Sequence, residues 1–285
     1  MELSSCRKGT IEAEAVRRYF NTPRHGSAAA VSMMAHEHNL PVDALLYRLR
    51  KELQTISDWL DVVPMKGRVL DLGCGAGGWL GIFAGRYGSV VGMEQSSTLI
   101  EAARERMNTL ANVEFIEGDV RAGLPDGPFD LIFLGGLCMY LNDGDTVTLL
   151  RSLSHRLTPA GSIILRESTV PKGRSTAQGE YQAVYRSTSV YRTLFLEAGL
   201  NAPEVRRNYG YTAMVTGEAL VELRRRWMPF LPTNSPFLGA LTWWDLRSTA
   251  PVSLLLMPRV LSRLGIAWPP LQNHFFRHRP CEEWN

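Results

Sequence analysis

Short apolar runs that alternate with amphipathic stretches dominate the middle of the chain, from Arg68 to about residue 168. The runs are RVLDLG, SVVGME, VEFIEG, FDLIFLG and GSIILRES. Between and after them, apolar residues recur three and four positions apart, as in helices with one buried face. Strands that alternate with helices form a parallel sheet with helices on both faces. We therefore expect a doubly wound α/β fold, with helices at about 77–86, 96–108, 143–157 and 187–198.

Two further strand-like segments, NAPEVRRNYGY and QNHFFRHR, follow these units. If they pair with each other, the fold is a Rossmann-like seven-stranded sheet whose last strand is antiparallel. Residues 10–62 have the apolar spacing of helices, and a long Pro- and Trp-rich stretch separates the last two strands. We expect three domains: an N-terminal helical cap (1–64), a core (65–210 and 271–285) and a helical insertion before the last strand (211–270).

The charge and cysteine content exclude several classes of protein. A net charge of +3, with Arg224 to Arg226 as the one compact basic cluster, argues against nucleic acid as a partner. The four cysteines form no CxxC pair, which indicates neither a zinc knuckle nor a disulfide framework. The N-terminus lacks the apolar core of a signal peptide, and no run reaches the roughly 20 apolar residues of a membrane span. We expect a cytoplasmic protein, and no pattern indicates its oligomeric state.

The first strand runs directly into a glycine-rich turn, RVLDLGCGAGGW. Asp71, Gly73, Gly75 and Gly77 form a D-x-G-x-G-x-G pattern there. Glycine tolerates positive φ and lets the backbone approach a ligand closely, and ligands of such sheets bind at the carboxyl ends of the strands. A diphosphate site typically has G-x-G-x-x-G, whereas a leading acid suits a cationic group. This turn therefore predicts a cofactor site that receives a positive charge.

Over about residues 68–200 the chain resembles the class I S-adenosylmethionine-dependent methyltransferases. VLDLGCGAGG is similar to their glycine-rich first motif, VVGMEQS to their second strand and FIEGDVR to their third-strand segment. LTPAGSIILRES is similar to their turn into the fifth strand, with Ala160 in place of a glycine of the usual P-G-G. The resemblance implies S-adenosylmethionine as cofactor and S-adenosylhomocysteine as product.

The resemblance also implies roles for the acids at the strand ends. Asp71 and the glycine backbone would hold the amino-acid end of the cofactor, and Glu94 would accept hydrogen bonds from both ribose hydroxyls. Asp119 would face the adenine amino group, and Val120 would supply a backbone contact to adenine. The complete predicted cofactor site is Asp71, Gly73, Gly75, Gly77, Glu94, Gln95, Asp119, Val120 and Gly135.

The segment after the fourth strand, GGLCMYLND, bears on the acceptor. It lacks the N-P-P-Y type turn common in nucleobase methyltransferases, which disfavours a nucleobase. The block from Gly135 to EYQAVYRSTSVYRTLF resembles small-molecule methyltransferases, including the phosphobase type, although it lacks the histidine usual after the fourth strand. Arginines beside tyrosine hydroxyls suit a phosphate or carboxylate. The residues assigned to acceptor binding are Arg166, Glu167, Tyr185 and Arg186, with an internal ion pair and packed aromatic rings as the alternative.

Methyl transfer from a sulfonium is an in-line displacement, so the protein mainly positions and desolvates two reactants. A hydroxyl acceptor also benefits from a positioned base. His25 is the candidate base, with Tyr19 and Tyr140 as further catalytic candidates, and an exposed loop histidine is the alternative for His25. We expect no metal, because the ends of the H-E-H triplet at His36 and His38 point to different faces of a helix.

Three functions remain as hypotheses. The first is methyl transfer to a nitrogen or oxygen of a small molecule. The second is transfer to a lipid-linked or glycan acceptor at a membrane, and the third is a non-catalytic scaffold that binds the cofactor. Residues 211–270 combine tryptophans, arginines and short apolar stretches, so we expect helices that form a hydrophobic acceptor pocket or a peripheral membrane contact, with simple packing on the sheet as the alternative.

Overall fold

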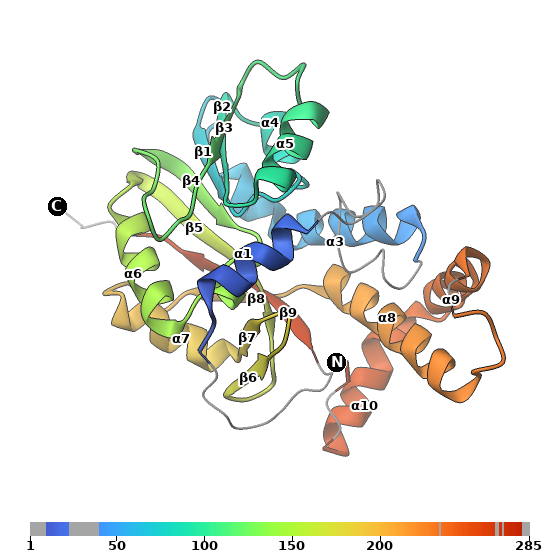
Figure 1. Ribbon diagram of the computed structural model, residues 1–285. Helices are drawn as coiled ribbons and strands as arrows, with labels where there is room; N and C mark the ends of the chain where they lie inside the picture. Colours follow the sequence, from blue (N-terminus) through green and yellow to red (C-terminus); the bar gives the residue numbers. More distant parts are fainter. Residues whose placement is uncertain (1–9, 23–39, 234, 266–267, 270, 281–285) are drawn as a thin grey trace. The chain divides into compact units, whose positions relative to one another are not determined.

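The computed structural model describes residues 10–22, 40–233, 235–265, 268–269 and 271–280 (Figure 1). The chain divides into two compact units. The first comprises Met1–Pro23, Asp58–Arg206 and His274–Asn285, and the second comprises Arg24–Ser57 and Arg207–Asn273. The predicted division into cap, core and insertion differs from these units and stays a proposal about domains.

The first unit is built on a mixed sheet whose central strands are parallel and run in the order β3-β2-β1-β4-β5. Strand β9 pairs with β5 and with β8, so the predicted seven-stranded order with antiparallel final strands is confirmed. Strand order reverses between β1 and β4, and ligands of such sheets bind beside that reversal. The strands are β1 (Arg68–Leu72), β2 (Ser89–Glu94), β3 (Val113–Glu117), β4 (Phe129–Leu134), β5 (Leu157–Thr169), β8 (Glu204–Arg207) and β9 (Gln272–His278).

Two strands beyond the predicted seven extend the sheet. Strands β6 (Arg174–Ala177) and β7 (Ala183–Arg186) form an antiparallel hairpin, and β7 joins β5 where Thr169 faces Arg186. Each strand has four residues, and the connection turns through Gly179 at φ 123°. Neither RSTA nor AVYR contains a long apolar run or a clear alternation of apolar and polar residues, so the sequence does not indicate these two strands.

Helices cover both faces of the sheet. Leu70 of β1 and Ile132 of β4 lie in one buried cluster with Leu150 and Phe195. Leu150 belongs to α6 and Phe195 to α7, two helices that lie side by side in Figure 1. On the other face, Phe133 packs against Trp79, with ring centroids 4.6 Å apart. The helices of the first unit are α1 (Ala13–Asn21), α4 (Leu80–Ala84), α5 (Ser97–Arg106), η1 (Cys138–Tyr140), α6 (Asp143–Ser154) and α7 (Thr188–Glu197).

The second unit is helical, as predicted for 211–270. It contains α8 (Tyr209–Trp227), α9 (Pro236–Ser248), the π-helical η2 (Pro251–Leu256) and α10 (Met257–Arg263), together with most of α3 (Val42–Asp61). Ala44 of α3, Ala213 of α8 and Trp243 of α9 share one buried cluster. Among the described residues, no helix is long and apolar enough to span a bilayer.

Candidate active site

The glycine-rich turn after β1 has the backbone conformation that its glycines predict. Gly73, Gly75 and Gly77 have φ values of 67°, 55° and 81°, a region that other residues rarely adopt. The Gly73 N–H donates to the Met93 carbonyl oxygen at 2.8 Å, which ties the turn to β2. A Cβ built on Gly73 would lie 3.2 Å from Leu137 Cδ1, whereas one built on Gly75 would meet nothing within 4 Å. The turn is therefore closed on one side and open beside Gly75.

Asp71, at the end of β1, is 1% exposed. Its Oδ2 atom is buried and has no hydrogen-bond partner among the described residues. Burial raises the pKa of this carboxyl from 3.8 to about 7, against the attraction of Arg166 and with a small contribution from Glu94. A buried carboxylate with an unused oxygen is costly, and a positively charged donor would stabilise it.

Glu94 is the last residue of β2, and its carboxylate bonds backbone N–H groups in the turns that follow β1 and β2. Its Oε2 accepts from the Gly75 N–H at 3.0 Å and its Oε1 from the Ser96 N–H at 2.9 Å. Burial raises the pKa of Glu94, against these hydrogen bonds to the backbone. A carboxylate offers about four lone-pair sites, so Glu94 keeps acceptor capacity beside its backbone hydrogen bonds.

A pocket of about 330 Å³, including its open mouth, lies at these strand ends. The structure therefore brings together predicted cofactor residues from three strands and a candidate catalytic tyrosine. Val16 of α1 also lines the pocket. The predicted residues in its wall are Gly73, Glu94, Gln95, Asp119, Val120 and Tyr140.

Asp119 has a partner that the sequence did not indicate. Arg121 donates to it from Nε at 2.9 Å and from Nη2 at 2.6 Å. Partial burial opposes ionisation of Asp119, but the hydrogen bonds and charge of Arg121 outweigh it and lower the pKa. An adenine amino group would therefore share this carboxylate with Arg121, and the predicted adenine contact stays a prediction.

Arg166 and Glu167 occupy the end of β5 in different ways. Arg166 Nη2 donates to the Gly135 carbonyl oxygen at 3.0 Å, which places two predicted site residues in contact. Glu167 is fully buried and accepts from the Cys138 N–H at 2.9 Å and the Met139 N–H at 3.2 Å. Burial raises its pKa to about 7, against the Cys138 hydrogen bond and the attraction of Arg186. Glu167 thus holds η1 from one side.

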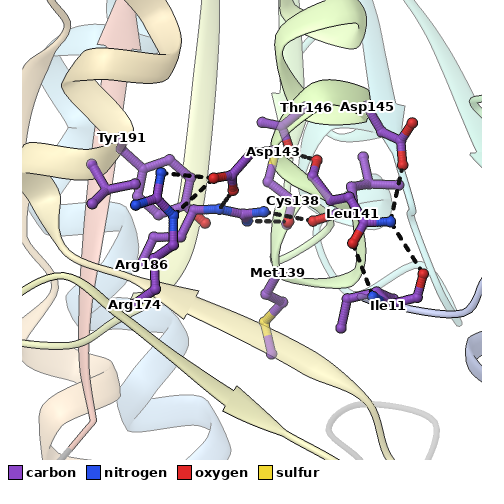
Figure 2. Close-up of polar contacts among 12 residues, drawn as sticks. Ile11, Cys138, Met139, Leu141, Asp143, Asp145, Thr146, Arg174, Arg186 and Tyr191 are labelled. Atoms are coloured by element: carbon purple, nitrogen blue, oxygen red, sulfur yellow. Dashed lines mark hydrogen bonds and ion pairs between the residues drawn. The ribbon is translucent and has the colours of Figure 1, made fainter. Parts of the chain in front are cut away.

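Arg186 holds the same turn from the other side (Figure 2). Its guanidinium is fully buried and donates to the carbonyl oxygens of Cys138 at 2.7 Å and Leu141 at 2.6 Å. Its Nε donates to Asp143 at 2.6 Å, and Arg174 bonds the other oxygen of that carboxylate. These contacts support a positioning role for Arg186, whereas its predicted acceptor contact stays untested.

The candidate tyrosines belong to one aromatic cluster. The Tyr140 hydroxyl lies 3.3 Å from that of Tyr181, which lies 3.1 Å from that of Tyr185. The Tyr19 ring packs edge-on against Tyr181, with centroids 5.1 Å apart. Tyr181 therefore joins three predicted site residues. It was missed because only its position four residues before Tyr185 in EYQAVY marks it.

The segment that leads into α1 is fixed to the turn that follows η1. The Asn142 side chain accepts from the Ile11 N–H at 2.9 Å and donates to the Ile11 carbonyl oxygen at 3.1 Å. Ser96 Oγ donates to the Phe20 carbonyl oxygen at 3.1 Å. Asn142 gave no sequence signal, because its partners are backbone groups 131 positions away.

Two remaining predictions concern the base and a metal. His25, like His36 and His38, lies outside the described residues, so its predicted role remains a prediction. Within the described part of the chain, no group of three or more histidine, cysteine or acidic side chains is placed to hold a metal ion.

The part of the chain that forms the sheet and carries its motifs is similar to known proteins. Residues 69–161 match a family described as a methyltransferase domain. The chain is 34% identical over 113 residues to a trans-aconitate 2-methyltransferase of Azoarcus sp. (strain BH72), covering 38% of this chain and 43% of that protein. It is 29% identical over 171 residues to phosphoethanolamine N-methyltransferase 1 of Triticum aestivum, covering 57% of this chain and 34% of that protein.

The similar region spans less than half the length of both relatives. A coclaurine N-methyltransferase structure, bound to N-methylheliamine and S-adenosylhomocysteine, shares the fold with a TM-score of 0.60 at 14% identity, covering 96% of this chain and 84% of that one. Through the domain that carries these strand-end motifs, the chain belongs to the class I S-adenosylmethionine-dependent methyltransferases.

Proposed function

We propose that the protein binds S-adenosylmethionine in the pocket at the strand ends and transfers its methyl group to a nitrogen or oxygen of a small molecule. The observation that carries this proposal is the buried Asp71 Oδ2, which has no partner among the described residues. Asp71 lies in β1, just before the glycine-rich turn that the class I family uses for the amino-acid end of this cofactor. An amino group there would supply the missing charge and hydrogen bond.

The neighbouring residues also fit the cofactor. The open space beside Gly75 leaves its backbone accessible, because nothing lies within 4 Å of where a Cβ would be. Glu94 lines the pocket and keeps acceptor capacity for a ribose hydroxyl beside its hydrogen bonds to the backbone. Asp119 and Val120 lie in the same wall, where adenine would bind.

When bound, the cofactor would supply a methyl carbon already activated by a sulfonium. The chain's own residues then have to orient the acceptor and exclude water. Tyr140 faces the pocket and connects through Tyr181 to Tyr185, so its hydroxyl is held in a hydrogen-bonded chain. Burial raises the pKa of Tyr181 well above its ordinary value of 10. Tyr181 therefore keeps its proton at neutral pH, which supports an orienting role for this chain of hydroxyls.

The small size of the acceptor is supported by the relatives' names. They designate methyltransferases of trans-aconitate and of phosphoethanolamine. Neither substrate is assigned to this chain, because the similarity covers only part of it. The Arg186 guanidinium also already donates to Asp143, Cys138 and Leu141. The shared property that we carry over is a small acceptor molecule.

The proposal is tested with methyl-labelled S-adenosylmethionine. The purified protein would be incubated with a panel of small amines, alcohols and carboxylates, and with a low-molecular-mass filtrate of its source organism. We expect a labelled small-molecule product from the wild type and much less from Glu94→Gln. Cofactor binding without any labelled product would instead indicate a scaffold, and absence of cofactor binding would refute the proposed site.

A further inference from the structure

Helix α9 of the second unit exposes apolar side chains that a helix normally buries. Trp243 is 6% exposed and packs in the unit's core, but its neighbour Trp244 is 68% exposed. Phe237 and Leu241 are also exposed. Leu241 lies four residues after Phe237, and Trp244 lies three residues after Leu241. This spacing places all three on one helix face. Helix α9 therefore has one apolar face in the core and a second one in solvent.

The next helical stretch repeats the feature. Val252, Leu256, Val260 and Leu264 are all exposed and lie four residues apart, along η2 and α10. A stripe of this spacing winds slowly along one side of a helix. The stretch thus presents a continuous apolar side to solvent.

A third set lies where α8 ends. Trp227 and Met228 are exposed, and Phe230 is 81% exposed. Soluble monomers rarely leave apolar side chains exposed over so much consecutive structure, unless the surface meets a partner. We call the exposed side chains of these three sets the apolar surface; they are Trp227, Met228, Phe230, Phe237, Leu241, Trp244, Val252, Leu256, Val260 and Leu264.

Charge favours a bilayer as that partner. Residues 220–265 contain six arginines and two acidic residues, a net charge of +4, whereas the whole chain carries +3. Basic residues beside exposed tryptophan and phenylalanine suit the headgroup region of an anionic membrane. A second copy of the same surface would bring like charges together. The described helices are also too short or too polar to span a bilayer, so the contact is interfacial.

We propose that the apolar surface docks on anionic lipid bilayers, with its tryptophan and phenylalanine side chains in the headgroup region and the arginines of residues 220–265 on lipid phosphates. The inference rests on the second unit alone and holds independently of the proposed methyl transfer.

Vesicle flotation tests the proposal directly. The full chain would be mixed with phosphatidylcholine vesicles, with or without about one third phosphatidylserine, at low and high salt. The test variant is the double substitution Phe237→Glu with Trp244→Glu. The matched control is Leu196→Glu, which places the same charge at an exposed leucine of α7 in the first unit.

We expect the wild type and Leu196→Glu to float with anionic vesicles and to be partly released by salt. The double variant should lose at least about tenfold in partition coefficient. Circular dichroism and the thermal transition would show that it is folded. Equal flotation of the double variant, or no binding of the wild type, would overturn the proposal. So would salt-resistant dimers that the same substitutions dissociate, because they would identify a second copy as the partner.

Discussion

Replacing Asp71 by asparagine should stabilise the protein in the absence of cofactor. Burial raises the pKa of Asp71 from 3.8 to about 7, so the folded chain keeps a proton that the unfolded chain has already released. Stability from this group is therefore complete below pH 3.8 and is lost as the pH rises to about 7. At about 1.4 kcal/mol for each pKa unit, ionising buried Asp71 lowers the stability by about 2 kcal/mol at pH 5 and about 4 kcal/mol at pH 8.

An asparagine has nearly the same shape and carries no charge, so it escapes this pH-dependent cost. Burying its amide costs the same at both pH values, so the informative quantity is a difference. Urea unfolding of both proteins should show that the variant gains roughly 2 to 3 kcal/mol relative to the wild type between pH 5 and pH 8. Calorimetry with S-adenosylmethionine should show that the same variant binds more weakly, because the cationic group loses its partner.

Glu167→Gln is the matched control. Burial also raises the pKa of Glu167 to about 7, but this carboxylate accepts hydrogen bonds from Cys138, Met139 and Tyr191. A glutamine NH₂ would face these donors, so this variant should be less stable than Asp71→Asn at pH 8. The reasoning is refuted if the stability of Asp71→Asn relative to the wild type is the same at pH 5 and pH 8, because Asp71 would then ionise normally.

Three further outcomes follow from the site. Glu94→Gln should weaken cofactor binding by about tenfold to a hundredfold in calorimetry, because a hydrogen bond to a charged group contributes about 1.5 to 3 kcal/mol; unchanged affinity would remove Glu94 from the site. Tyr181→Phe should alter the acceptor KM or kcat and leave cofactor affinity unchanged, since it breaks the hydroxyl chain and keeps the ring; wild-type kinetics would exclude that chain from acceptor positioning. Arg186→Lys should lower the unfolding free energy by about 2 to 4 kcal/mol in urea, because the guanidinium bonds its acceptors from three separate nitrogens and the donors of an ammonium all lie on one; a raised acceptor KM with unchanged stability would favour the acceptor role instead.

The parallel sheet could be predicted because β1, β2 and β4 are almost entirely buried. Runs such as FDLIFLG are mostly apolar, which indicates a buried strand. The turn after β1 is indicated by glycines, which tolerate positive φ. The β6–β7 hairpin was missed because RSTA and AVYR contain neither a long apolar run nor a clear alternation. The fold could therefore be predicted from the sequence where consecutive residues of a buried element are apolar in a regular pattern.

The places of the predicted site residues follow from the sequence where a side chain stands at the end of a strand. Asp71 and Glu94 stand next to the strand ends, so their place follows from the strands themselves. Arg186 and Glu167 have the residue types of an acceptor pocket, yet most of their partners are backbone groups of residues 138–141. Their side-chain partners are Asp143 and Tyr191. A sequence shows which side chains are present, but backbone partners become visible only when the turn is folded.

A crystal structure of the protein with S-adenosylhomocysteine tests the central claim most directly. We predict that its amino group lies within hydrogen-bond distance of Asp71 Oδ2 and that its ribose hydroxyls donate to Glu94. Electron density for the ligand elsewhere, with Asp71 Oδ2 left without a partner, would contradict the assignment of this pocket as the cofactor site.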